Sequence, residues 1–196
     1  MRKLGDILSI KTNNIEPEKG KILISEPFLG DYYFKRSVVL LADHNEEGSF
    51  GLILNKPLEM KLGDVVADFP DFDARVYLGG PVESDNLFFI HTLGNQIEGS
   101  LEILNGIYWG GRLEVVKEMM FLKKLSPSDI RFYIGYSGWS PKQLEEELKR
   151  NAWVVSLANS HDLLKTKPKV LWEKSLERLG GDYLYWPKFP VDPMQN

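Results

Sequence analysis

The sequence contains no cysteine and no long run of apolar residues. Without cysteine the chain cannot form disulfides, thiolate nucleophiles, iron–sulfur clusters or cysteine-ligated zinc sites, which is typical of proteins kept in a reducing compartment. The longest strictly apolar run, Val38–Ala42, is far shorter than the roughly 20 residues that cross a bilayer. We therefore expect a cytoplasmic protein without a membrane anchor.

A signal-peptide pattern and a positive charge balance are also missing. The first 20 residues carry charges and no apolar segment of the signal-peptide kind, so secretion is not expected. A formal net charge of −4 disfavours attachment to phosphate backbones. A lysine-rich stretch between Lys165 and Arg178 lacks any known nucleic-acid reader motif, so we expect direct nucleic-acid binding to be weak.

What is present is the composition of one folded domain. The 196 residues are 43% hydrophobic and 12% aromatic, which is enough for a sizeable core. No repeat, low-complexity tract or Gly/Ser linker divides the chain. We divide it into an N-terminal extension (1–20), an α+β domain (21–182) and a C-terminal tail (183–196).

Hydrophobic periodicity predicts strands mainly early and helices mainly late, which favours a single α+β domain over a repeating βαβ sheet. The predicted strands cover 21–25, 37–42, 49–54, 74–78, 87–91 and 129–136. Segments 37–42 and 49–54 follow the hairpin pattern, and so do segments 74–78 and 87–91. The predicted helices cover 62–66, 112–124, 141–150 and 168–179, and Ser140 and Gln143 are placed for a capping box.

Three short segments beside apolar strands are candidates for a recognition site. We expect them to gather on one side of the fold as turns, because loops on a rigid scaffold often carry function. Their residues are His44 and Asn45, then Gly79, Gly80 and Pro81, then Tyr136, Ser137, Gly138 and Trp139.

Each segment has more than one interpretation. The loop at His44 has the residue types of a metal or acid–base site, although consecutive loop residues favour a plain turn. Gly79-Gly80-Pro81 is either a tight turn or a cradle of amides for an anion. Trp139 either anchors a partner or seals the core beneath the helix that follows.

For single residues, the sequence supports a structural role better than a catalytic one. Ser137 lacks the glycine two residues later that a hydrolase nucleophile elbow needs. His91 ends an apolar run and is expected to be hydrogen-bonded and half-buried. Asp31 and Arg36 are a candidate structural pair, because an Arg fork satisfies a carboxylate. We predict no metal and no cofactor, and an enzymatic role is not favoured.

Several ordered blocks resemble the AlgH/YqgE family. They include Pro27–Asp31, Gly51–Pro57, Leu78–Val82, Gly135–Trp139 and Asn151–Trp153, so the resemblance spans about Gly20 to Gly180. It implies a bacterial cytoplasmic protein whose helices flank a barrel-like, largely antiparallel sheet, and members of the family are often labelled transcriptional regulators. The family offers no established catalytic residues to carry over.

The sequence thus favours a non-enzymatic regulatory or interaction protein that binds an unidentified protein partner or small ligand. The alternative is a small-molecule-binding protein or an enzyme with no recognisable motif. Fold resemblance alone does not decide between them.

Overall fold

The computed structural model describes residues 13–190, so most of the predicted N-terminal extension and the end of the predicted tail lie outside the described residues. The strands are β1 (Ile22–Ser25), β2 (Val38–Asn45), β3 (Gly48–Ile53), β4 (Pro57–Lys61), β5 (Arg75–Leu78), β6 (Val82–His91), β7 (Leu101–Leu104), β8 (Ile107–Trp109), β9 (Ile130–Trp139) and β10 (Trp153–Ser156). The helices are α2 (Leu62–Val65), α3 (Leu113–Phe121), α4 (Gln143–Lys149), α5 (Ser160–Lys165) and α6 (Pro168–Leu179), with 3-10 segments η1 (Gly94–Gln96) and η2 (Gly181–Lys188).

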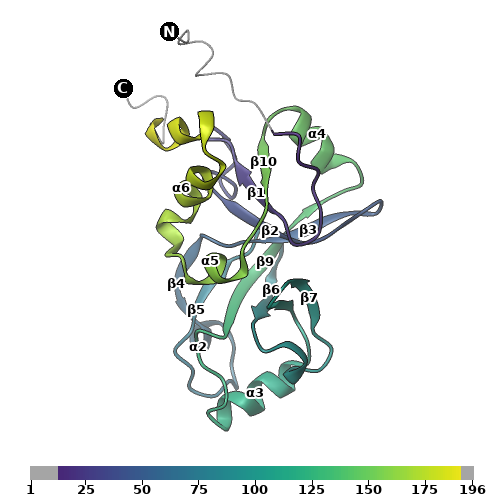
Figure 1. Cartoon of the computed structure of the whole chain (residues 1–196). Helices are drawn as coiled ribbons and strands as arrows, with labels where there is room; N and C mark the ends of the chain where they lie inside the picture. The colour runs from purple at the N-terminus through teal and green to yellow at the C-terminus, as the bar shows by residue number, and fades with distance from the viewer. Residues whose placement is uncertain (1–12, 191–196) are drawn as a thin grey trace, which may run out of the picture.

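One largely antiparallel sheet organises the chain. Its strands follow the order β10-β1-β2-β3-β9-β6-β8-β7, while β5 joins β4 to β9 and pairs with β9 in parallel. The expected α+β class and largely antiparallel core are confirmed. The sheet does not close on itself, so it is not a complete barrel. In Figure 1 the helices flank this sheet, with α3 at one end and α4 and α6 toward the other.

Strand β9 is the central element of the sheet. Its first half pairs with β5 on one edge and β6 on the other, and its last residues pair with β3. Ile130, Phe132 and Ile134 face one apolar cluster, whereas Tyr136 packs on the cluster that holds Tyr133. The predicted strand 129–136, if regular, would place Tyr136 on the same face as Ile134, and the structure does not. The cause is Gly135, whose φ of +66° interrupts the regular alternation of the strand.

A crossing of three glycines joins β5 to β9. The Gly79 amide donates to the Ile134 carbonyl (2.8 Å), and the Gly79 carbonyl accepts from the Ile53 amide (2.9 Å). A Cβ atom at Gly79 would overlap the Gly135 carbonyl, one at Gly80 would overlap the Tyr136 backbone, and one at Gly135 would overlap the Gly80 carbonyl. The backbones can approach this closely only because none of the three residues has a side chain.

Three apolar clusters fill the space between the sheet and the helices. Helix α6 buries Leu171, Trp172 and Leu176 against β1 and β2, as its apolar spacing predicts. Helix α3 contributes Val116 and Met120 to the second cluster. Helix α4 closes the third cluster through Leu144. The other members of this cluster include Leu23 and Trp153.

The aromatic residues near the C-terminal end dock onto the domain. Trp186 of η2 is only 2% exposed and belongs to the main core, while Phe189 packs on Phe28 with ring centroids 5.2 Å apart. Tyr185 stays partly exposed. Most of the rings of this segment therefore pack on the domain and are not offered to a partner.

Two local predictions are wrong. Strands β5 and β6 do not form a hairpin, because β9 inserts between them. Helix α4 begins at Gln143 rather than at Pro141, since Lys142 adopts a left-handed φ of 66°. Half of the predicted capping box is nevertheless present, because the Ser140 amide donates to Gln143 Oε1 at 3.0 Å.

No helix among residues 13–190 has both the length and the apolar character needed to cross a membrane.

The glycine crossing can be tested by substitution. We expect Gly79→Ala to lower the free energy of unfolding by roughly 2–4 kcal/mol, because the new methyl group must displace the Gly135 carbonyl. Gly63→Ala is the matched control, since nothing lies within 4 Å of a Cβ atom there and its backbone is helical. Urea unfolding would measure both. A loss no larger than that of the control contradicts the tight-crossing account.

Candidate functional site

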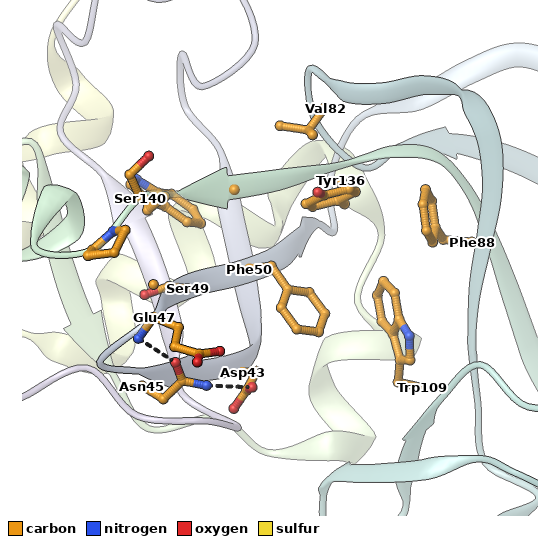
Figure 2. A pocket seen from close by; sticks show the side chains of 14 residues that line it. Asp43, Asn45, Glu47, Ser49, Phe50, Val82, Phe88, Trp109, Tyr136 and Ser140 are labelled. Carbon is orange, nitrogen blue, oxygen red and sulfur yellow. Dashed lines mark hydrogen bonds between the residues drawn. The ribbon is translucent and has the colours of Figure 1, made fainter.

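An open cleft of about 720 Å³ lies where the β2–β3 hairpin meets β6, β8 and the end of β9. Its aromatic members lie on different strands, which the sheet brings together (Figure 2). The lining residues are Asp43, Asn45, Glu47, Gly48, Ser49, Phe50, Val82, Phe88, Trp109, Tyr136, Gly138, Trp139, Ser140 and Pro141.

Four partly buried rings form one wall of the cleft. Phe50 lies 5.3 Å from Trp109 and 6.2 Å from Tyr136, measured between ring centroids. Phe88 lies 5.6 Å from Trp109 and 5.5 Å from Tyr136. These separations fall within the range of favourable aromatic pairs, so the rings hold one another in place. We call Phe50, Phe88, Trp109 and Tyr136 the aromatic wall.

The space above the wall depends on a glycine. Gly138 is the cross-strand partner of Phe50, so no side chain from β9 covers the Phe50 ring at that position. A Cβ atom at Gly138 would lie 3.2 Å from Tyr136 Cε2 and 3.4 Å from Val82 Cγ2. Since such contacts are tight, even a methyl group would crowd the wall.

The rim of the cleft beside Phe50 is polar and acidic. Asp43 is paired with Phe50 across the hairpin, which places both side chains on one face of the sheet. Asp43 accepts from the His44 amide (2.9 Å) and from Asn45 Nδ2 (3.0 Å), and Asn45 Oδ1 accepts from the Glu47 amide (2.8 Å). These bonds fix the loop, and the Glu47 side chain is exposed at its edge.

The structure brings the three sequence-predicted segments together around the end of β9. Asn45, Tyr136, Gly138 and Trp139 line the cleft, whereas His44 turns its Nδ1 to Ser49 Oγ at 2.7 Å. Gly79, Gly80 and Pro81 lie next to this region without lining it. Since the Gly79 amide already donates to Ile134, that amide is not available for an anion.

The first and third segments lie in strands and are not the turns that the sequence predicts, since His44 and Asn45 end β2. Tyr136–Trp139 continues β9 and pairs with β3 and β6. Ser137 is fully buried and donates its hydroxyl to the Gly79 carbonyl at 2.9 Å, which ties it to the glycine crossing. Ser137 therefore has a structural role in this arrangement.

Trp139 is a core residue with one edge at the cleft. It is 5% exposed and packs against Phe34 and Trp153, with ring centroids 6.0 Å away in each case. Its Nε1 donates to Glu147 Oε2 at 3.0 Å, and Trp153 Nε1 donates to the same oxygen at 2.7 Å. Of the two roles considered for Trp139, sealing the core beneath α4 matches this geometry.

The candidate pair of Asp31 and Arg36 does not form. Asp31 Oδ1 accepts from the amides of Tyr33 (2.7 Å) and Phe34 (3.0 Å), which closes a local turn. The Arg36 guanidinium donates to the Phe189 carbonyl and lies 4.9 Å from the Trp172 ring centroid. Arg36 therefore binds the C-terminal segment and not the nearby carboxylate.

Sequence reasoning missed Phe50, Phe88 and Trp109. Phe88 and Phe50 were visible only as apolar strand residues, and Trp109 falls on β8, a strand of three residues that carries little periodic signal. Their convergence depends on strand order, which the hairpin prediction for β5 and β6 had wrong.

The described residues offer little for acid–base or metal chemistry. His91 is fully buried; its Nε2 donates to the Gly110 carbonyl (3.1 Å) and its Nδ1 accepts from the Leu93 amide (3.2 Å). This bonding holds the neutral imidazole, and burial lowers the pKa of His91 below its ordinary 6.5. Within residues 13–190 no three His, Asp or Glu side chains are grouped to hold a metal ion.

The fold and the cleft define a class: a largely antiparallel α+β domain with an aromatic surface cleft and an acidic rim. The family model described as AlgH-like matches residues 22–184. The chain therefore belongs to the AlgH-like family, and the resemblance noted in its sequence is confirmed.

Relatives and solved structures agree with this assignment. The chain is 45% identical to the UPF0301 protein BF2109 of Bacteroides fragilis over 97% of both chains, and 44% identical to a UPF0301 protein of Bacteroides thetaiotaomicron over 97% of both. The solution structure of AlgH from Pseudomonas aeruginosa matches with a TM-score of 0.70 and 29% identity, covering 87% of this chain and 94% of that one. Protein DIP2367 from Corynebacterium diphtheriae has a TM-score of 0.75 at 21% identity over 91% and 95%, which shows the shared fold.

The buried histidine predicts a pH dependence of stability. Because the pKa of His91 is lower in the folded than in the unfolded chain, the unfolded state binds more protons just below pH 6.5. The contribution of His91 is thus complete above that pH and is lost as the pH falls toward the folded pKa. Urea unfolding at several pH values should show a smaller slope in His91→Gln than in the wild type. Equal slopes would contradict this assignment.

The carboxylate shared by two indoles predicts a large local effect. We expect Glu147→Ala to lower the free energy of unfolding by roughly 2–4 kcal/mol, because the buried Trp139 and Trp153 donors both lose their acceptor. Glu146→Ala removes an exposed carboxylate from the same helix and should change stability by less than about 0.5 kcal/mol. Similar losses in the two variants would show that the shared acceptor is unimportant.

Proposed function

We propose that this chain is a non-enzymatic interaction protein of the cytoplasm and that it recognises a segment of a partner protein in the aromatic cleft. The observation that carries the proposal is the aromatic wall itself. Four rings from β3, β6, β8 and β9 are held at mutual distances of 5.3–6.2 Å yet remain partly exposed. Rigid Trp, Tyr and Phe side chains at a concave surface are the residues that most often dominate binding energy at interfaces.

The hydrogen bonds of two serine hydroxyls, Ser137 beside the cleft and Ser49 in its lining, support recognition over catalysis. The Ser137 hydroxyl donates to a backbone carbonyl, and His44 is engaged with Ser49 on the hairpin. A nucleophile would need an adjacent base with a free lone pair, and a general base would need access to substrate. Ser137 has no such base, and the hydroxyl of the His44–Ser49 pair belongs to a residue only 8% exposed, so substrate has little access to it, whereas the rings suit non-covalent contacts.

Any regulatory role is proposed to act through the partner rather than through direct contact with DNA. The lining of the cleft contains Asp43 and Glu47 and no lysine or arginine. Such a surface repels phosphate groups, and the net charge of −4 adds to this effect. The basic residues of α6 lie outside the cleft.

A free small molecule is the second candidate occupant. The volume of about 720 Å³ lies within the range of small-molecule sites. A thermal-shift screen of metabolites distinguishes the two, because a ligand that binds only the folded state raises the melting temperature. Strong stabilisation by a metabolite would favour the small-molecule reading.

The aromatic wall can be tested without emptying the core. We expect Trp109→Leu and Phe88→Leu each to weaken partner capture by about tenfold or more, since each removes a ring but keeps apolar bulk. Tyr32→Leu is the control, because Tyr32 is 86% exposed and does not line the cleft. Affinity capture with the full chain, with melting curves for every variant, is the measurement. If the folded Trp109→Leu and Phe88→Leu proteins capture the partner as well as Tyr32→Leu does, the cleft is not the interface.

A further inference from the structure

We propose that the cleft recognises an organic cation: the guanidinium or ammonium group of an arginine or lysine side chain carried by the partner segment. This inference rests on the proposed function of the cleft and adds the chemical class of its occupant. Two features of the cleft carry it: the charge of the rim, and an aromatic wall that no cation of the described chain covers.

The first feature is the charge of the lining. Asp43 and Glu47 are the only ionisable acids among the lining residues, and no lining residue is basic, so the cleft carries two negative charges. The Asp43 carboxylate is held by the His44 amide and Asn45, both neutral donors that leave its charge uncompensated. In the view of Figure 2 the Asp43 and Glu47 carboxylates lie beside the Phe50 ring, at one end of the aromatic wall. A cation seated there would meet both charges.

The second feature is the contrast with aromatic rings elsewhere in the chain. Four of those rings are covered by the chain's own cations at 4.6–5.2 Å from the ring centroid. These pairs are Arg36 over Trp172, Lys117 over Phe69, Arg131 over Tyr77 and Lys188 over Tyr185. Over the described part of the chain, no such cation covers a ring of the aromatic wall. Aromatic faces attract cations through their quadrupole, most strongly at Trp and Tyr, and this wall contains both.

The strand pairing places a carboxylate and aromatic rings side by side. Gly138 stands opposite Phe50 and has no side chain to cover its ring. Asp43 stands opposite Phe50 on the other neighbouring strand, so the ring has a carboxylate on one side and the Tyr136 ring on the other. The planar guanidinium can stack on a ring while its edge donates to a carboxylate, which is the combination offered here.

A second large cavity has a lining of mixed charge and serves as a comparison. It holds about 800 Å³ and is lined by Arg75, Arg131 and Lys165 together with Asp73 and Asp129. Arg131 already donates to the carbonyls of Leu54 and Leu164. Its mixed charge does not select a cation, so this cavity does not compete with the aromatic cleft for a basic side chain.

The test is an NMR titration of the ¹⁵N-labelled full chain with two peptides. Acetyl-Gly-Arg-Gly-amide carries the cation, and acetyl-Gly-citrulline-Gly-amide replaces it with a neutral group of nearly the same shape. We expect the arginine peptide to shift the amides of Asp43–Phe50 and of Trp109 and Tyr136. The citrulline peptide should bind at least about tenfold more weakly.

Variants then separate charge from shape. The double variant Asp43→Asn, Glu47→Gln keeps the size of both side chains, and it should reduce affinity for the arginine peptide about tenfold and abolish the preference over citrulline. Glu46→Gln is the matched control, because Glu46 is an exposed carboxylate in the same loop that does not line the cleft. It should leave both affinities nearly unchanged.

The outcomes distinguish this inference from the function on which it rests. Equal binding of the two peptides in the cleft, or an equal effect of Glu46→Gln, overturns cation recognition and leaves the cleft as an interface. If free arginine amide binds as tightly as the arginine peptide, the source is a small cation and not a partner segment. If neither peptide shifts the cleft amides, cation recognition is overturned, and the capture experiment with Trp109→Leu decides whether the interface itself stands.

Discussion

The close approach of Gly79 and Gly80 to Gly135 is the constraint on which the rest of the structure depends. Without side chains at these positions, the end of β5 reaches the Gly135 carbonyl and the Tyr136 backbone, and the Ser137 hydroxyl bonds to the Gly79 carbonyl. The crossing fixes where β9 leaves β5 and begins to pair with β3. A single L side chain at the crossing would force these strands apart, so the order of the sheet depends on three missing Cβ atoms.

The same crossing also determines the cleft. Because Gly135 takes a positive φ, the residues after it change faces, and Tyr136 joins Phe50 and Phe88 instead of Ile134. The regular strand would have placed Tyr136 in the cluster beneath α3 and left the wall incomplete. The irregularity at Gly135 therefore also brings the Tyr136 ring to the cleft, and the structural role and the proposed recognition role of this segment have one physical origin.

Much of the secondary structure could be predicted from local sequence, because periodicity and caps act over short distances. Helix α6 begins at Pro168 and ends before Gly180 as its pattern indicates, and the β2–β3 hairpin follows from the polar loop at residues 44–48. Strand order could not be predicted in this way, since the insertion of β9 between β5 and β6 is a long-range event. The candidate site could likewise be predicted only in part. Asn45 and Tyr136 were predicted because they lie in distinctive local segments. Trp109 was missed because its position in the cleft depends on strands that are distant in the sequence.

The distribution of cations over the chain connects the fold to its proposed function. A domain with a net charge of −4 still places Arg36 against Trp172 and Arg131 against Tyr77, where each guanidinium also satisfies backbone carbonyls. Internal arginines thus stabilise the fold by covering rings and carbonyls together. The aromatic wall offers rings with carboxylates in place of carbonyls, and β9 contributes a glycine where a covering side chain would lie. The chain pairs its own cations with aromatic rings at several places. The aromatic wall presents such rings together with carboxylates, and it is therefore suited to bind a cation that another molecule supplies.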